Sequence, residues 1–137
     1  MIQNVNQVQK THYHALMTTE LPDCGVTRFL AVLDGPWATL IIKELLSGPR
    51  RFTQLRQALP GISPHTLSSR LRRFEEHELL TRTVYAEIPP RVEYELTAAG
   101  QRLRPVFNAM DIWGCSLSPQ LASPTLLEED GPKAHTR

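Results

Sequence analysis

Residues 63–77 carry apolar side chains at the period of a helix with one buried face. Three of them follow the i, i+4, i+7 spacing that forms a single stripe: Leu67, Leu71 and Phe74. Ser63 can accept a hydrogen bond from an N–H group of the first turn, and Pro64 suits the first helical position. The pattern therefore predicts a helix over 63–77 that packs on a core through this stripe.

The opposite side of this predicted helix is polar and basic. At ~100° per residue, it presents His65, Ser69 and Arg72, flanked by Thr66, Ser68 and Arg73. No acidic residue occurs before Glu75. Hydroxyl, imidazole and guanidinium groups in the N-terminal half of a helix suit a DNA major groove. The alternative is an ordinary solvated surface helix.

Three more helices are expected before this one. The first covers 26–33 and stops at Asp34-Gly35-Pro36; the second, over 37–47, is apolar on much of its circumference and is predicted to be the central core helix. Residues 50–52 form a short extended link, and Thr53 can cap a third helix over 54–59. A Pro60-Gly61-Ile62 turn then leads into 63–77, which completes a helix-turn-helix.

Two β-type runs follow, over residues 81–86 and 92–96, both rich in Val, Tyr and Thr. The loop between them, 87–91, contains two consecutive prolines. A hairpin beside a helix-turn-helix is a wing, placed to touch phosphates or a minor groove. Arg82 and Arg91 suit contacts with the DNA backbone.

The last predicted helix begins at Thr97, which can cap it, and continues to about Trp113, with a bend at Pro105. Its apolar stripe consists of Leu103, Val106, Phe107, Met110 and Trp113. A winged domain does not need so apolar a helix after its hairpin. We therefore expect a subunit interface there, the alternative being packing on its own domain.

These patterns divide the chain into a polar N-terminal arm (1–20), one domain (21–114) and a C-terminal tail (115–137) that we expect to be disordered. The predicted fold class is α+β and mostly helical. The chain has 137 residues and a formal net charge of +1, so its overall charge says little about partners. Its distribution says more, because eight arginines and four glutamates fall between residues 50 and 91, with no lysine or aspartate. This local excess favours an anionic partner.

Other function classes receive little support. No catalytic motif, Gly-rich phosphate loop or cofactor signature is present, so we expect neither an enzyme nor a bound cofactor. His12 and His14 have the spacing of metal ligands, but without a clear third ligand a solvated pair is the better interpretation, and no metal site is predicted. With no signal peptide and no apolar run of ~20 residues, a cytoplasmic protein without membrane contact is expected.

Cys24 stands at or just before the N-terminus of the first predicted helix. Unpaired N–H groups and the helix dipole favour a thiolate there, Arg28 can add to this effect, and Asp23 opposes it. The alternative is a buried, inert cysteine. Two cysteines, Cys24 and Cys115, do not make a secreted disulfide framework.

Four parts of the sequence carry a family resemblance: the run from Trp37 to Phe52, Leu59-Pro-Gly-Ile-Ser63, Leu71, and the wing and strand Pro89-Pro-Arg-Val-Glu-Tyr-Glu-Leu-Thr97. They resemble the HxlR-type winged helix-turn-helix regulators, which are related in shape to MarR-type proteins. The resemblance covers about residues 24–113. It implies a homodimer, built by the first and last helices of the domain, that binds inverted-repeat operators and usually represses, sometimes activates. The N-terminal helix, with Phe29, would then join the C-terminal helix in the interface.

The resemblance also bears on the cysteines. Members commonly carry a cysteine just before the first domain helix, and some use it to sense quinones, aldehydes, diamide-like oxidants or hypochlorite. Cys24 occupies that position, although Gly25 replaces the usual proline. In some members the oxidised cysteine forms a disulfide with a second cysteine of the partner subunit, and Cys115 could play that part.

The resulting hypothesis is a dimer that sets two recognition helices about 34–36 Å apart in successive major grooves. The residues expected at base edges are His65, Thr66, Ser69 and Arg72. Those expected at phosphates or in the wing contact are Arg50, Arg51, Ser68, Arg70, Arg73 and Arg91. Arg70 is ambiguous because it lies near the apolar stripe and could pair with a glutamate instead.

Two alternatives stay open. One is a regulator gated by a small ligand in the dimer cleft, in a pocket lined by Trp37, Phe107 and Trp113, each of which could equally be plain core. The other is a winged-helix module that binds a protein. Its expected sign would be apolar residues on the outer face of 63–77, where only polar ones occur.

Overall fold

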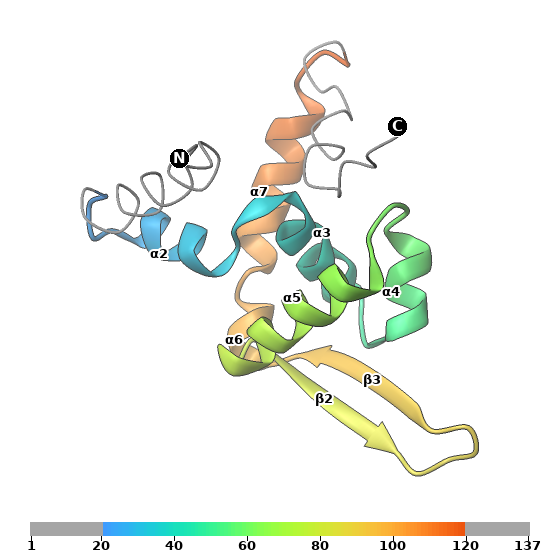
Figure 1. Cartoon of the computed structure of the whole chain (residues 1–137). Coiled ribbons are helices and arrows are strands. Elements are labelled where there is room, and N and C mark those ends of the chain that lie inside the picture. Colours follow the sequence, from blue (N-terminus) through green and yellow to red (C-terminus); the bar gives the residue numbers. More distant parts are fainter. Residues whose placement is uncertain (1–20, 120–137) are drawn as a thin grey trace, which may run out of the picture. The chain divides into compact units, whose positions relative to one another are not determined.

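The computed structural model describes residues 21–119 and divides at Leu33 into two units (Figure 1). The first unit contains α2 (Gly25–Val32), and the second begins at Asp34 and contains every other described element. The polar arm, His12, His14 and the tail beyond Pro119 lie outside the described residues. Each unit is described by itself.

Helix α2 begins after Cys24, whose extended backbone forms the N-cap position. None of the helix's own residues is buried. Val26 and Leu30, which are i and i+4 on the helix, are 69% and 49% exposed. The helix predicted over 26–33 is confirmed, and its apolar side chains are largely open to solvent.

The second unit consists of five helices and three strands among the described residues (Figure 1). The helices are α3 (Gly35–Leu46), α4 (Phe52–Ala58), α5 (Pro64–Glu76), α6 (Ala98–Gln101) and α7 (Arg104–Cys115). The strands are β1 (Arg50–Arg51), β2 (Leu80–Tyr85) and β3 (Arg91–Leu96). This is a mostly helical α+β winged-helix fold, as the sequence predicted.

The core of this unit is built around α3 and α5. Ile41, Ile42 and Leu45 of α3 are completely buried, which confirms α3 as the central core helix. The stripe of α5 is buried as well, with Leu67 and Phe74 at 0% exposure. Burying one such side chain stabilises the fold by about 1.5–3 kcal/mol. The stripe therefore fixes which side of α5 faces outward.

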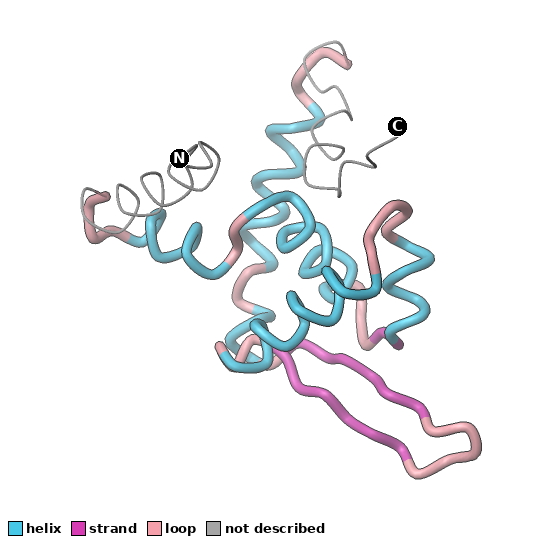
Figure 2. The backbone as a smooth tube through the Cα atoms, in the orientation of Figure 1, coloured by secondary structure: helices cyan, strands magenta, loops and turns pink. Residues whose placement is uncertain are grey.

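The sheet is antiparallel with strand order β1-β3-β2. The hairpin β2–β3, with its connecting loop, is the wing, and Figure 2 shows it projecting beyond the helices of its unit. β1 pairs Arg50 with Tyr94 and Arg51 with Glu93. Of the extended link expected over 50–52, Arg50 and Arg51 therefore form a third strand, whereas Phe52 already begins α4. Two residues are too few to show the alternation that identifies a strand, so only the tertiary pairing reveals it.

The helix starts agree with expectation in two of three cases. The Thr66 N–H donates to Ser63 Oγ at 3.0 Å, and the Gly100 N–H donates to Thr97 Oγ1 at 3.2 Å. The prediction that Thr53 caps α4 is wrong, because the helix starts two residues earlier than expected, at Phe52, and Arg51 is its N-cap residue. There the Arg51 N–H donates to Gln54 Oε1 at 2.8 Å.

The helix predicted from Thr97 to Trp113 is broken rather than bent. α6 ends at Gln101, and α7 restarts at Arg104 with Pro105 in its first turn. A proline has no N–H group and its ring clashes with the carbonyl four residues earlier, so a new first turn is the position that accepts it. The Arg104 guanidinium donates to Leu46 O at 2.7 Å, which anchors the start of α7 to the last turn of α3.

Candidate nucleic-acid interface

The cap of α5 orders the side chains that begin its outer face. Ser63 Oγ accepts from the Thr66 N–H, and the Ser63 hydroxyl donates to Thr66 Oγ1 at 2.8 Å. Thr66 is half-buried, while His65, one residue earlier, is exposed. Thr66 therefore takes part in the cap, and its hydroxyl hydrogen is left to donate outward.

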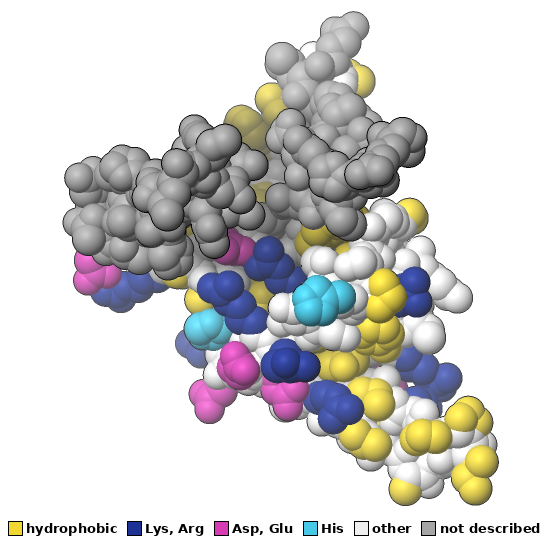
Figure 3. Space-filling model, in the orientation of Figure 1, with side chains coloured by type: hydrophobic (Ala, Val, Ile, Leu, Met, Phe, Trp, Pro, Cys, Tyr) yellow, Lys and Arg dark blue, Asp and Glu magenta, His cyan; other side chains and the backbone are white. Residues whose placement is uncertain are grey.

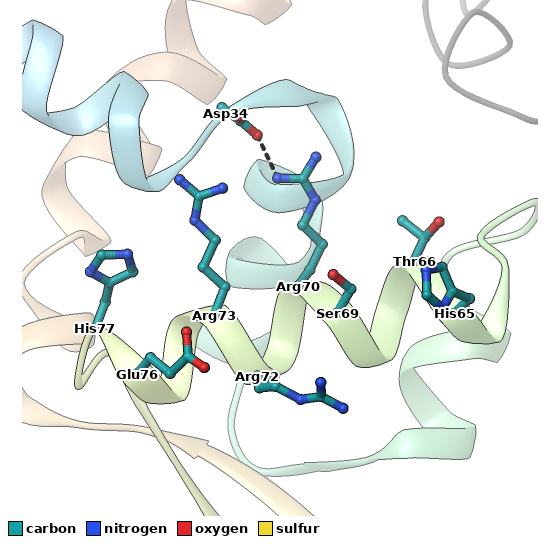
Figure 4. Close-up of a pocket in the computed structure, with 9 residues that line it drawn as sticks. All are labelled: Asp34, His65, Thr66, Ser69, Arg70, Arg72, Arg73, Glu76 and His77. Atoms are coloured by element: carbon teal, nitrogen blue, oxygen red, sulfur yellow. Dashed lines mark hydrogen bonds and ion pairs between the residues drawn. The ribbon is translucent and has the colours of Figure 1, made fainter. Parts of the chain in front are cut away.

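The outer face of α5, defined by His65, Thr66, Ser69 and Arg72, lies over one surface hollow. The full lining consists of Asp34, His65, Thr66, Ser69, Arg70, Arg72, Arg73, Glu76 and His77 (Figure 4). All four residues predicted at base edges are thus brought together. Ser68, predicted at a phosphate, is exposed beside them but does not line the hollow.

The hollow is predominantly basic, since three arginines and two histidines line it together with two carboxylates. In Figure 3, basic and histidine side chains gather over this part of the molecule. Figure 4 shows the arginines dividing into two directions: Arg70 and Arg73 extend toward Asp34, whereas Arg72 extends from the other side of the helix. Arg72 is exposed and extends away from the other two arginines, so its guanidinium is available to bind a guanine edge.

Arg70 forms an ion pair with Asp34, at the start of α3, through its Nη1 atom. Its side chain is only 25% exposed, compared with 54% for Asp34. The sequence left open whether Arg70 binds a phosphate or pairs with a glutamate. The partner in the structure is an aspartate 36 residues away in the sequence, which no local pattern could identify.

Arg91 is engaged within the wing itself. Its Cζ atom lies 4.1 Å from the centre of the Tyr85 ring, and its Nη2 atom lies 3.3 Å from Glu87 Oε1. Arg91 Nε is the one buried side-chain nitrogen or oxygen of the described residues without a hydrogen-bond partner. The predicted wing contact is therefore a side chain that also closes the hairpin, and the roles of Tyr85 and Glu87 were missed from the sequence. The opposite charges of Glu87 and Arg91 at the two ends of the predicted loop were the available signal.

The end of the wing is apolar where Figure 3 shows it, and Ile88 is fully exposed there. The arginines of the sheet lie elsewhere. Arg50 and Arg82 both stand opposite Tyr94, on either side of β3, whereas Arg51 stands opposite Glu93. Successive strand residues point to opposite faces, so the side chains of Arg50 and Arg51 leave the sheet on opposite sides.

The Cys24 thiol is exposed and free, and Sγ lies 3.3 Å from Thr27 Oγ1. Hydrogen bonding to the Thr27 hydroxyl, and then to backbone N–H groups of Thr27 and Val26, lowers the pKa of Cys24 below its ordinary value. The predicted charge effects on this thiol offset each other, because Arg28 pairs with Asp23 at 2.9 Å. Thr27 was missed from the sequence.

Cys115 is also free and exposed, and it is the last residue of α7, two positions beyond the predicted helix end. No group of three metal-binding side chains occurs within residues 21–119. No helix in that range is long and apolar enough to cross a membrane.

The residues predicted for the dimer interface divide into two groups. Val106, Met110 and Trp113 form an i, i+4, i+7 stripe on α7 and are 42%, 44% and 67% exposed. Phe107 is buried in the chain's own core, and Leu103 and Phe29 are half-buried. Trp37, a proposed pocket residue, is also buried. Exposure of a continuous apolar stripe is typical of an interaction surface.

The chain is similar to known transcriptional regulators. A model of the HxlR-like helix-turn-helix family matches residues 32–121. The HTH-type transcriptional regulator sll1512 of Synechocystis sp. is 40% identical over 134 residues, which cover 91% of this chain and 99% of that relative.

Solved structures of transcriptional regulators are also similar to this chain. The redox regulator HypR superposes with TM-scores of 0.65 in its oxidized form and 0.67 in its reduced form, at 35% and 34% identity. These alignments cover 69% and 72% of this chain and 98% and 97% of HypR. A MarR-family regulator from Porphyromonas gingivalis W83 gives a TM-score of 0.68 at 30% identity, covering 74% of this chain and 99% of that one. The chain therefore belongs to the HxlR-like helix-turn-helix family of transcriptional regulators, structurally similar to MarR-family regulators.

Proposed function

We propose that this regulator is a homodimer that binds an inverted-repeat operator through α5, with the outer face of that helix against base edges. The observation that carries the proposal is the exposed, basic outer face of α5 opposite a fully buried apolar stripe. His65, Thr66, Ser69 and Arg72 contact bases, and Arg72 reads a guanine. Ser68, Arg73, Arg50 and Arg51 are the candidates for phosphate contacts.

Titration of the protein with the DNA upstream of its own gene, at two salt concentrations, tests this proposal. Each phosphate contact steepens the dependence of log K on log salt by about 0.9. We expect tight, salt-sensitive binding and a loss of preference for the operator in Arg72→Gln. If that DNA is not bound, selection from random duplexes replaces it. Binding that ignores sequence in every duplex would contradict the proposal, as would a protein ligand captured by the same face.

The dimer is proposed to form through α7 and α2. In α7 the stripe of Val106, Met110 and Trp113 is exposed, and α2 has no buried residue. Met110→Asp should therefore give a monomer, whereas Asn108→Asp, an exposed change off the stripe, should keep the dimer. Light scattering after gel filtration separates these outcomes. A dimer that survives Met110→Asp would place the interface elsewhere.

Cys24 is proposed as a sensing thiol, because it is exposed with a lowered pKa and because HypR, named as a redox regulator, is a structural relative. With diamide as oxidant, two thiols form one disulfide and lose two electrons and two protons, and diamide becomes the corresponding hydrazine. Cys115 of the partner subunit is the candidate second thiol.

The redox proposal predicts that diamide changes operator binding in the wild type but not in Cys24→Ser. Cys115→Ser should prevent a disulfide-linked dimer on a non-reducing gel while the Cys24 thiol still reacts. If diamide leaves binding unchanged in all three proteins, a non-covalent ligand becomes the better explanation for regulation. A small electrophile that modifies Cys24 alone would act without Cys115.

A further inference from the structure

Asp34 occupies a position where its side chain would ordinarily cap a helix. It is the N-cap residue of α3, with an extended backbone, but its carboxylate makes no capping hydrogen bond. The carboxylate instead accepts a hydrogen bond from the Arg70 guanidinium on α5. A residue outside the helix-turn-helix is thus bonded to the helix that we propose reads DNA.

Asp34 and Arg70 both line the hollow that the outer face of α5 also lines. Figure 4 shows the Arg70 side chain extending from α5 toward Asp34, next to Arg73, while His65 and Ser69 lie further toward the helix start. Arg70 stands on the flank between the outer face and the buried stripe, where the phosphates on either side of a recognition helix approach. The Arg70 guanidinium, which is placed to bind such a phosphate, is therefore already bound to the Asp34 carboxylate.

A carboxylate and a phosphate are alternative partners for one guanidinium, because both present planar or near-planar pairs of oxygens to its fork of donors. The ion pair is partly exposed, with side-chain exposures of 25% and 54%, so water and salt weaken it. An operator phosphate can therefore displace the Asp34 carboxylate from Arg70. Breaking this ion pair makes the free energy of DNA binding less favourable.

We propose that Asp34 sets the DNA affinity of this protein by competing with an operator phosphate for Arg70. The inference rests on the proposed function and names a residue that tunes it. In this proposal Asp34 acts through Arg70 and does not itself contact DNA.

The test is a double-mutant cycle on operator binding, with Asp34→Asn, Arg70→Gln and the double variant. Asparagine has the shape of aspartate and lacks its charge, so Asp34→Asn should free Arg70. We expect it to bind the operator on the order of two- to fivefold more tightly at low salt, the range of an exposed pair. The dependence of log K on log salt should become steeper by about 0.9, for one added phosphate contact.

In the Arg70→Gln background, Asp34→Asn should change neither affinity nor salt dependence. Glu76→Gln is the matched control, because it removes the other carboxylate that lines the hollow. If Asp34 acted only through its general electrostatic field, its effect would persist without Arg70 and Glu76→Gln would reproduce it. Either result would overturn the inference.

Weaker binding by Asp34→Asn would also overturn the inference, because Asp34 would then orient Arg70 for DNA. Unchanged binding would do the same. Thermal unfolding of each variant checks that it is folded before its affinity is interpreted. If the wild type binds no duplex, in its own upstream region or after selection, the proposed function fails, whereas a failure confined to Asp34→Asn overturns this inference alone.

Discussion

The guanidinium carbon of Arg91 lies 4.1 Å from the centre of the Tyr85 ring, and the two residues are paired across the last register position of the wing. Glu87 adds an ion pair to the same guanidinium at 3.3 Å. The Arg91 guanidinium, at the start of β3, is therefore held within the hairpin by Tyr85 and Glu87.

We expect Tyr85→Leu to loosen the wing without removing any charge. An exposed cation–π contact contributes about 0.5–1 kcal/mol, enough to raise hydrogen exchange of the amides in β2 and β3 several-fold. Tyr85→Phe keeps the ring and should leave exchange unchanged. If Tyr85→Leu exchanges like the wild type, the ring does not hold Arg91.

Arg72 and Arg73 are adjacent in the sequence, but substituting them should change DNA binding in different ways. Arg72→Gln should lose about 1–3 kcal/mol of discrimination at one base pair, because a bidentate contact to guanine is lost. Arg73→Gln should weaken binding to all duplexes and reduce the salt dependence of log K by about 0.9. Titrations with the operator and with single-base variants measure both effects. Arg56→Gln, an exposed change on α4, is the control and should behave as wild type.

The helix predictions succeeded where the signals were local. Ser63 as a cap, Pro64 in the first turn and the stripe through Leu67 and Phe74 all lie within one segment, and the structure has each of them as predicted. The Thr97 cap was identified for the same reason. The break between α6 and α7 was underestimated, because one proline, Pro105, is compatible with either a bend or a restart.

The contacts of the candidate site depend on tertiary structure, and the sequence could not supply them. Asp34 and Arg70 meet because α3 and α5 share a core, although they are 36 positions apart. Arg91 faces Tyr85 because of the strand register, which a five-residue loop of unknown shape does not fix. The predicted phosphate set accordingly includes two arginines, Arg70 and Arg91, that form ion pairs within the chain.

The Cys24 thiol should lose reactivity when the Thr27 hydroxyl is removed. The hydrogen bond from Thr27 is the largest cause of the lowered pKa of Cys24, so Thr27→Val should raise that pKa and reduce the thiolate fraction near neutral pH. Alkylation by iodoacetamide, followed against pH in Cys115→Ser protein, gives the pKa directly. Thr27→Ser keeps the hydroxyl and should keep the wild-type profile. Identical profiles for Thr27→Val and wild type would exclude Thr27 as the cause.

Gly100 is required by a close approach of the backbone. A Cβ atom at this position would lie 2.4 Å from Leu79 O and 3.0 Å from a methyl carbon of Leu96. Gly100→Ala should therefore destabilise the protein by about 1–3 kcal/mol, the usual range for overpacking. Gly114→Ala, with no atom within 4 Å of the added carbon, is the matched control and should not destabilise it. Urea unfolding compares the two, and equal midpoints would contradict the prediction.

Glu78 follows His77, the C-cap residue of α5, and has a φ of 58°, in the left-handed region that favours glycine. The Leu79 N–H donates to Phe74 O at 2.9 Å, which completes a Schellman-type helix end around this residue. Glu78→Gly should raise the free energy of unfolding by up to about 1 kcal/mol, because it relieves the cost of φ > 0. Glu75→Gly, inside the helix, should lower it by a similar amount. A Glu78→Gly variant that unfolds more easily than wild type would show that the glutamate side chain contributes more than the backbone costs.

The most direct test of the central claim is protection of guanine N7 atoms from methylation on an operator bound by the protein, since N7 lies in the major groove. If α5 of each subunit reads a half-site, two protected regions should appear about 10–10.5 base pairs apart. Arg72→Gln should lose protection at the same guanine in both regions. Bound DNA without N7 protection, or a pattern unaffected by Arg72→Gln, would contradict reading of the major groove by the outer face of α5.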